Sequence, residues 1–347
     1  MRKYLLASIV FGAVGGAHAQ GSVTLYGALD TGLLYQSNTA GGPGKGFAAI
    51  NGGWGPSFWG FTGSEDIGDE YRIHFKVEGG YSTVTGGIGD SNGNFLGRQT
   101  YVGVDMPFGT LNAGLQFSPF FISVYGGDPR GLSFFSSSLS EYINSFGVSG
   151  LFESNAVVYS SPSFAGLRGS VEYAFGNVAG SFPAGRHISA AVNYGNGPVT
   201  ATAAYFEAKD PTSGTTTLRG ENVGAGYKFG PVTVKLAFTN YRDPASDAVL
   251  KNVNVYSVGA QWMVTYALAL DAGVYASRDE NVTANKSMLY GAGAEYFLSK
   301  RTTLYVQLGM VDNKGAMNTS LTVEAPNRFN VPQGTTIGVD LGIRHSF

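Results

Sequence analysis

The sequence contains no cysteine, and charged residues make up only 13% of it. Without cysteine the chain forms no disulfide bonds and no thiolate sites for zinc or iron–sulfur clusters. The charged fraction is about half of the roughly 25% that is typical of soluble globular domains. Lysine and arginine total 22 against 24 acidic residues, with no basic block, and this balance argues against nucleic acid as a partner.

Long apolar runs are also missing. Beyond the N-terminal segment, no stretch approaches the roughly 18 apolar residues that suggest a membrane-spanning helix. At the N-terminus, a basic pair (residues 2–3) precedes an apolar stretch (5–14) and an A-x-A site (17–19). This three-part pattern predicts a cleavable signal peptide at residues 1–19. We therefore expect residues 20–347 to form one exported domain.

The sequence has instead many short segments of alternating polarity. In YRIHFKVEGG (71–80), every second residue is apolar up to Val77, and the residues between are histidine or charged. Successive side chains of a β-strand point to opposite faces, so this segment has one apolar face and one ionic face. The same alternation occurs at 22–35, 167–175, 232–238, 303–310 and 336–347.

The links between these segments are sorted by length. Tight turns rich in glycine, proline and asparagine lie at 65–70, 105–109, 161–166, 195–198, 228–231 and 298–302, and longer loops lie at 37–53, 117–150, 207–218 and 313–334. Short turns at one end and long loops at the other are typical of outer-membrane barrels. We predict an all-β fold, a transmembrane antiparallel barrel of about 16 strands whose apolar faces meet lipid and whose ionic faces line water. The alternative, a soluble exported sandwich or β-helix, gives no reason for loops to be sorted this way.

Six segments of the chain resemble the trimeric general porins of Gram-negative outer membranes, in the beta-proteobacterial branch. They are SVTLYGALDTGL (22–33), WGFTGSEDIGD (59–69), FLGRQTYVGV (95–104), YSSPSFAGL (159–167), LSKRT (298–302) and GIRHSF (342–347). The resemblance implies a homotrimer of 16-stranded barrels in outer-membrane lipid and lipopolysaccharide, each with a third loop, here residues 117–152, folded into the lumen. Phe347 matches the terminal aromatic residue that the family uses as a signal to the barrel-assembly machinery.

The candidate site is the narrowest part of the pore, because fixed charges and diameter there set selectivity. Its predicted lining residues are Arg72, Lys76, Arg98, Arg168, Asp128, Arg130, Glu141, Phe58 and Phe152. Arg98 keeps an arginine of the family's pore wall. Phe58 and Phe152 stand where the family often has arginines, and this loss of two cations predicts weakened anion selectivity.

The predicted function is an outer-membrane channel for passive diffusion of small hydrophilic solutes and ions. One alternative is a pore biased towards particular solutes by the phenylalanines of the 117–152 loop (Phe120, Phe121, Phe134 and Phe135), if these rings do not simply pack the loop against the wall. Another is a barrel that serves mainly as a surface adhesin. No G-x-S-x-G or H-E-x-x-H motif is present, so we expect no enzyme activity, and no cofactor or metal site is predicted.

Overall fold

A computed structural model describes residues 22–39, 44–244, 250–324 and 333–347. The expected signal peptide at residues 1–19 lies outside the described residues. No helix in the described ranges is long and apolar enough to cross a membrane.

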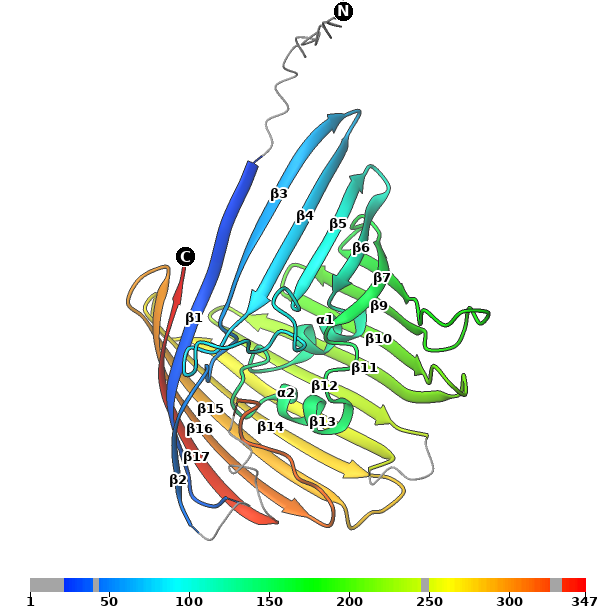
Figure 1. The fold of residues 1–347 in the computed structure, drawn as a ribbon. Coiled ribbons are helices and arrows are strands. Elements are labelled where there is room, and N and C mark those ends of the chain that lie inside the picture. Colours follow the sequence, from blue (N-terminus) through cyan, green and yellow to red (C-terminus); the bar gives the residue numbers. More distant parts are fainter. Residues whose placement is uncertain (1–21, 40–43, 245–249, 325–332) are drawn as a thin grey trace, which may run out of the picture.

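The described residues form seventeen β-strand segments and two short helices (Figure 1). The strands are β1 (Ser22–Gln36), β2 (Gly46–Ile50), β3 (Phe58–Gly68), β4 (Tyr71–Gly80), β5 (Gln99–Met106), β6 (Gly109–Gln116), β7 (Glu153–Ser160), β8 (Leu167–Ala174), β9 (His187–Asn196), β10 (Val199–Lys209), β11 (Thr216–Phe229), β12 (Val232–Arg242), β13 (Asn252–Met263), β14 (Leu268–Asp279), β15 (Lys286–Phe297), β16 (Thr302–Lys314) and β17 (Gly334–Ser346). The helices are α1 (Pro119–Gly127) and α2 (Ser138–Phe146).

The strands pair antiparallel, consecutively from β3 to β17, and the ring closes where β1 pairs with β17 (Figure 1). On the other side of β1, its first half pairs with β3 and its second half with β2. The seventeen segments therefore occupy sixteen places in the wall, because β2 and β3 share one. The predicted 16-stranded antiparallel barrel is confirmed.

Alternation along the strands divides the wall into an outer and an inner face. On β1, Leu33 is 66% exposed on the outside, whereas its neighbour Leu34 is 2% exposed on the inside. On β4, Glu78 points inward and is buried against Arg98. The apolar stripe of these strands thus forms the outer, lipid-facing surface that the sequence predicts.

The links at the two ends of the barrel differ in length. At one end the turns are 69–70, 107–108, 161–166, 197–198, 230–231, 264–267 and 298–301. Two expected long loops at the other end are shorter than predicted. The 37–53 loop contains strand β2, and the 207–218 loop narrows to 210–215, where the Asp210 carboxylate accepts hydrogen bonds from the backbone N–H groups of Thr212 and Ser213.

Segment 117–152, called here the inner loop, leaves β6 and carries both helices inside the barrel (Figure 1). The sequence reading did not predict these helices. Ser118 caps α1 by accepting a hydrogen bond from Phe121 N, and Ser137 caps α2 in the same way through Leu139 N. An aromatic cluster of Phe120, Tyr142, Phe146, Phe206 and Tyr241 fixes the helices to the inner wall of β10 to β13.

Candidate functional site

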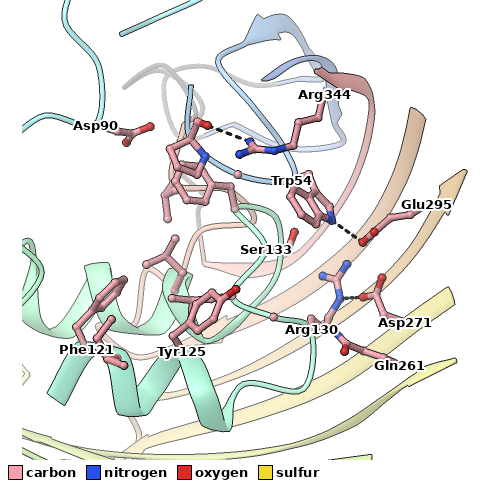
Figure 2. A pocket seen from close by; sticks show the side chains of 18 of the residues that line it. Trp54, Asp90, Phe121, Tyr125, Arg130, Ser133, Gln261, Asp271, Glu295 and Arg344 are labelled. Atoms are coloured by element: carbon pink, nitrogen blue, oxygen red, sulfur yellow. Dashed lines mark hydrogen bonds and ion pairs between the residues drawn. The ribbon is translucent and has the colours of Figure 1, made fainter. Parts of the chain in front are cut away.

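A cavity of about 1300 Å³ lies inside the barrel, between the inner loop and the opposite wall (Figure 2). Figure 2 shows Phe121 and Tyr125 on α1 at one side, and Trp54, Glu295 and Arg344 across from them. The charged side chains of the lining are Asp90, Arg98, Arg130, Lys228, Lys235, Asp271, Glu295 and Arg344. The inner loop gives the cavity an apolar side, and the strands give it a charged side.

Arg98 is held on the wall and is 7% exposed. Its Nε donates to Glu78 Oε1 at 2.7 Å, and its Nη1 donates to the Asp90 carbonyl oxygen at 3.1 Å. The guanidinium carbon lies 5.1 Å from the Phe58 ring centre and 5.8 Å from that of Phe117, so two aromatic faces contact this cation. One of the two predicted phenylalanines, Phe58, therefore touches the arginine that the family pattern keeps.

Phe152, the other predicted phenylalanine, lines the cavity directly. Its ring centre lies 5.9 Å from that of Phe117, which links it to the group around Arg98. An aromatic patch thus adjoins the buried cation at this end of the cavity.

Arg130 joins the inner loop to the far wall. Its side chain is fully buried and makes a salt bridge with Asp271 on β14 and a hydrogen bond with Gln307 on β16. It also donates to the carbonyl oxygens of Phe135 and Ser136, at 2.6 and 2.8 Å. Because every contact is made inside the protein, Arg130 is built as an anchor of the loop as well as a lining residue.

Asp128 organises the inner loop from within. Its carboxylate accepts hydrogen bonds from the backbone N–H groups of Arg130, Leu132 and Ser138 and from the Ser138 hydroxyl, at 2.6 to 3.1 Å. The residue is fully buried and is not part of the cavity lining. The structure therefore places this predicted pore charge at the C-terminal end of α1, where it fixes the fold of the loop.

Glu141 lies on the far side of α2, where it is fully buried and accepts a hydrogen bond from Thr319 at 3.1 Å. Burial raises the pKa of Glu141 to about 7, although hydrogen bonds from Thr319 and Ser277 oppose the shift. The carboxyl does not line the cavity.

Two further acidic residues lie next to each other, Asp90 in the cavity lining and Glu324. Burial and the negative charge of the adjacent Asp90 carboxyl raise the pKa of Glu324. Two adjacent carboxyls disfavour ionisation of both groups at once, so the pair binds a proton more readily than two separate acids.

The three other predicted cations point into the barrel but lie outside the cavity lining. Arg72 is exposed at the end of β4, beside the short turns. Arg168 donates to the Ser161 carbonyl oxygen at 3.1 Å, next to a short turn, and Lys76 lies 5.7 Å from the Tyr26 ring centre. Their roles in selectivity remain predictions.

Several lining residues were not predicted. Arg344 pairs with Asp30 at 3.2 Å and lies 5.0 Å from the ring centre of Trp54, whose Nε1 donates to Glu295 at 2.5 Å. Alternation of inward and outward side chains along the strands places four of these residues in the lumen: Lys235, Asp271, Glu295 and Arg344. Trp54 lies in the irregular segment between β2 and β3, where no periodic pattern exists.

Phe347 lies at the seam of the barrel, where its backbone exchanges two hydrogen bonds with Gly27, at 3.0 and 3.2 Å. A Cβ at Gly27 would approach the Phe347 ring to 2.5 Å, so only glycine leaves room for the aromatic ring. The ring is 39% exposed on the outer face. Its role as an assembly signal stays a prediction.

Comparison with known proteins identifies the family. Residues 6–316 match the family described as Gram-negative porin, whose members are channels and not enzymes. Outer membrane porin protein 32 of Delftia acidovorans is 30% identical over 361 residues, covering all of both chains.

Solved structures share the fold. The anion-selective porin from Comamonas acidovorans superposes with a TM-score of 0.81 at 24% identity, covering 94% of this chain and 100% of that one. OmpT of Vibrio cholerae, solved in a trimer form, gives a TM-score of 0.70 at 19% identity, covering 94% of this chain and 99% of that one. The chain belongs to the Gram-negative porin family, and it is an outer-membrane channel for passive solute diffusion.

Proposed function

We propose that small hydrophilic solutes and ions cross this channel through the cavity between the inner loop and the wall, with only a weak preference for anions. Residues 20–347 act in this proposal as one channel domain after removal of the signal peptide at 1–19. The inner loop narrows the passage, and the wall beside it sets the charge. The remainder of the barrel supplies the water-filled route on either side.

The observation that carries the weak selectivity is the pairing of the arginines. Each of the three arginines of the lining forms a salt bridge with a carboxylate: Arg98 with Glu78, Arg130 with Asp271 and Arg344 with Asp30. A cation paired at such distances presents little net charge beyond about one Debye length, roughly 8 Å at physiological salt. Phe58 and Phe152 add rings where further cations would strengthen an anion preference.

The assembly that we propose is a homotrimer embedded in outer-membrane lipid and lipopolysaccharide. The support is the trimer form of a structural neighbour together with the apolar outer face of the barrel. The barrel-assembly machinery would recognise Phe347. Size determination by light scattering in detergent tests the trimer, and a mass of one or two chains would contradict it.

Planar-bilayer recording tests the selectivity. Purified channel in a tenfold KCl gradient is expected to conduct without added substrate and to give a reversal potential near zero. A reversal potential close to the chloride equilibrium value would contradict weak selectivity. Absence of conductance would contradict the channel function itself.

A further inference from the structure

Helix α1 exposes large apolar side chains to the lumen. Ile122 is 45% exposed and Tyr125 is 53% exposed, and both line the cavity together with Phe121. Residues three and four positions apart share one helix face, so these three side chains form a continuous strip. Across a turn of the same loop, Val148 is 51% exposed and lines the cavity too.

Phe120 and Phe121 fix α1 to the aromatic cluster, since Phe120 is fully buried and the Phe121 ring packs against Tyr142. Ile122 and Tyr125 are not members of that cluster, so the exposed part of the strip is not used to hold the loop. When a solute covers apolar surface that faces water inside a narrow channel, the free energy of the system falls. The strip is therefore a surface on which the apolar part of a passing solute can bind.

Two lysines lie beside this strip, on strands that face α1. Lys235 Nζ donates to the carbonyl oxygen of Asp128 at 3.2 Å, and the Asp128 N–H is bonded to the carbonyl oxygen of Tyr125 at 3.4 Å. The ammonium group thus lies about one helical turn from the Tyr125 backbone. Lys228 follows on the neighbouring strand β11, where it pairs with Thr233, two residues before Lys235 on β12.

These lysines differ from the arginines of the lining in how their charge is used. In the described part of the chain, no salt bridge joins Lys228 or Lys235 to a carboxylate, whereas all three lining arginines are paired. The acidic group that acts most directly on Lys235 is Asp128, whose carboxylate already accepts four hydrogen bonds within the inner loop. Lys228 is exposed in the cavity lining. Both ammonium groups therefore keep donors for an anionic solute.

Resting on the proposed channel function, we propose that this lumen face of α1 together with Lys228 and Lys235 forms a binding subsite for small aryl carboxylates. The aromatic ring lies on Ile122 and Tyr125, where an offset or edge contact with the tyrosine is favourable. The carboxylate faces the two lysines. Only a solute with both a ring and a negative charge uses both halves of the subsite. Acetate lacks the ring, and benzylamine lacks the negative charge.

Block of KCl conductance measures binding at this subsite. Benzoate, acetate and benzylamine are added to single channels in planar bilayers, and the concentration that halves the current is determined for each. Partial burial of one ring predicts a half-blocking concentration about tenfold lower for benzoate than for acetate. Benzylamine is expected to block no better than acetate. Equal block by benzoate and acetate in a channel that conducts KCl would overturn the subsite while leaving the channel function intact.

Variants separate the two halves of the subsite. Tyr125→Ser and Ile122→Ser are each expected to reduce the benzoate-to-acetate preference about threefold or more, because each removes part of the apolar strip. Lys235→Gln is expected to weaken block by both anions severalfold, and Lys235→Arg to retain it. Matched controls are Tyr266→Ser and Lys300→Gln, since both residues lie in exposed short turns outside the cavity lining. A benzoate preference that survives in both strip variants, or falls equally in the controls, would overturn the proposal.

Discussion

The two sides of the inner loop carry similar residues, but these residues are buried on one side and exposed on the other. On the wall side, Phe120 and Tyr142 are fully buried in the aromatic cluster. On the lumen side, Ile122 and Tyr125 are about half exposed. Composition alone does not distinguish these positions, because both sides of the loop are apolar and aromatic.

The difference lies in what each side chain contacts. The wall side supplies the packing that keeps the loop in the barrel, and the lumen side presents an apolar surface to whatever passes. The contacts of Phe135 agree with this division, because its ring is fully buried, packs with Leu321 and does not line the cavity. Aromatic residues in a pore loop thus serve either structure or solute, and burial separates the two.

Replacement of one side chain from each side of the inner loop should show the largest difference between the two sides. Phe120→Ala leaves a cavity in the aromatic cluster and is expected to lower the free energy of unfolding by about 3–5 kcal/mol. Tyr125→Ala removes an exposed ring and is expected to change it by about 0.5 kcal/mol or less. Thermal or guanidinium unfolding in detergent measures both values. Equal losses would show that the lumen side also supports the loop.

Arg130 tests whether the wall attachment also depends on charge. Arg130→Met removes one partner of a buried ion pair and leaves Asp271 uncompensated, which typically costs about 3–5 kcal/mol. We expect a less stable channel with larger fluctuations of the open current, because the loop loses its link to β14 and β16. Arg301→Met, in an exposed short turn, is the matched control. Unchanged stability and quiet current in Arg130→Met would contradict the anchoring role.

Glu141 gives the wall side a pH dependence. Its pKa of about 7 lies above the ordinary value of 4.5, so the folded state binds the proton more tightly than the unfolded state. Well below pH 4.5 the carboxyl is protonated in both states and does not affect the free energy of unfolding. As the pH rises from about 4.5 to about 7, the free energy of unfolding falls, by roughly 3 kcal/mol in total, and above that range it no longer changes.

Glu141→Gln should remove this loss of stability between pH 4.5 and 7, since the amide does not titrate. Unfolding curves of both proteins across this range provide the measurement. Parallel pH profiles for the two proteins would show that Glu141 does not carry the effect. Lumen-side variants such as Tyr125→Ala are expected to keep the original profile.

The smallest expected effect is on ion selectivity. Lys235→Gln removes one unpaired cation from the lining and should shift the reversal potential towards cation preference, by about a twofold change in permeability ratio. Lys235→Arg should not shift it. A shift of the same size in Lys300→Gln would show that the charge acts from anywhere on the surface.

The sequence was sufficient for the wall and insufficient for the loop. Alternation assigns the inward face of strands such as 71–80, because one residue of error would place charges in lipid. Inward parity also places Lys235 and Arg344 in the lumen. It does not say which inward charges lie at the cavity, since that depends on how the inner loop packs.

The predicted acids of the loop illustrate the limit. Asp128 and Glu141 are charged residues in a pore loop, yet the first caps and braces α1 and the second is buried behind α2. Their directions depend on two short helices whose caps, Ser118 and Ser137, are weak signals in a serine-rich segment. The place of Trp54 in the lining could not be predicted for a similar reason, because irregular backbone has no periodic pattern of side-chain directions.

The segment between β2 and β3 links the wall of the barrel to the inner loop. In this short bridge, Gly53 donates to the Tyr305 hydroxyl at 2.9 Å and accepts from the Ser133 hydroxyl of the inner loop at 3.1 Å, while Gly55 donates to Asp30 at 3.0 Å. These hydrogen bonds connect the segment after β2 directly to the inner loop at Ser133. A binding domain grafted next to β2 is therefore expected to change the current through the channel when it captures its target.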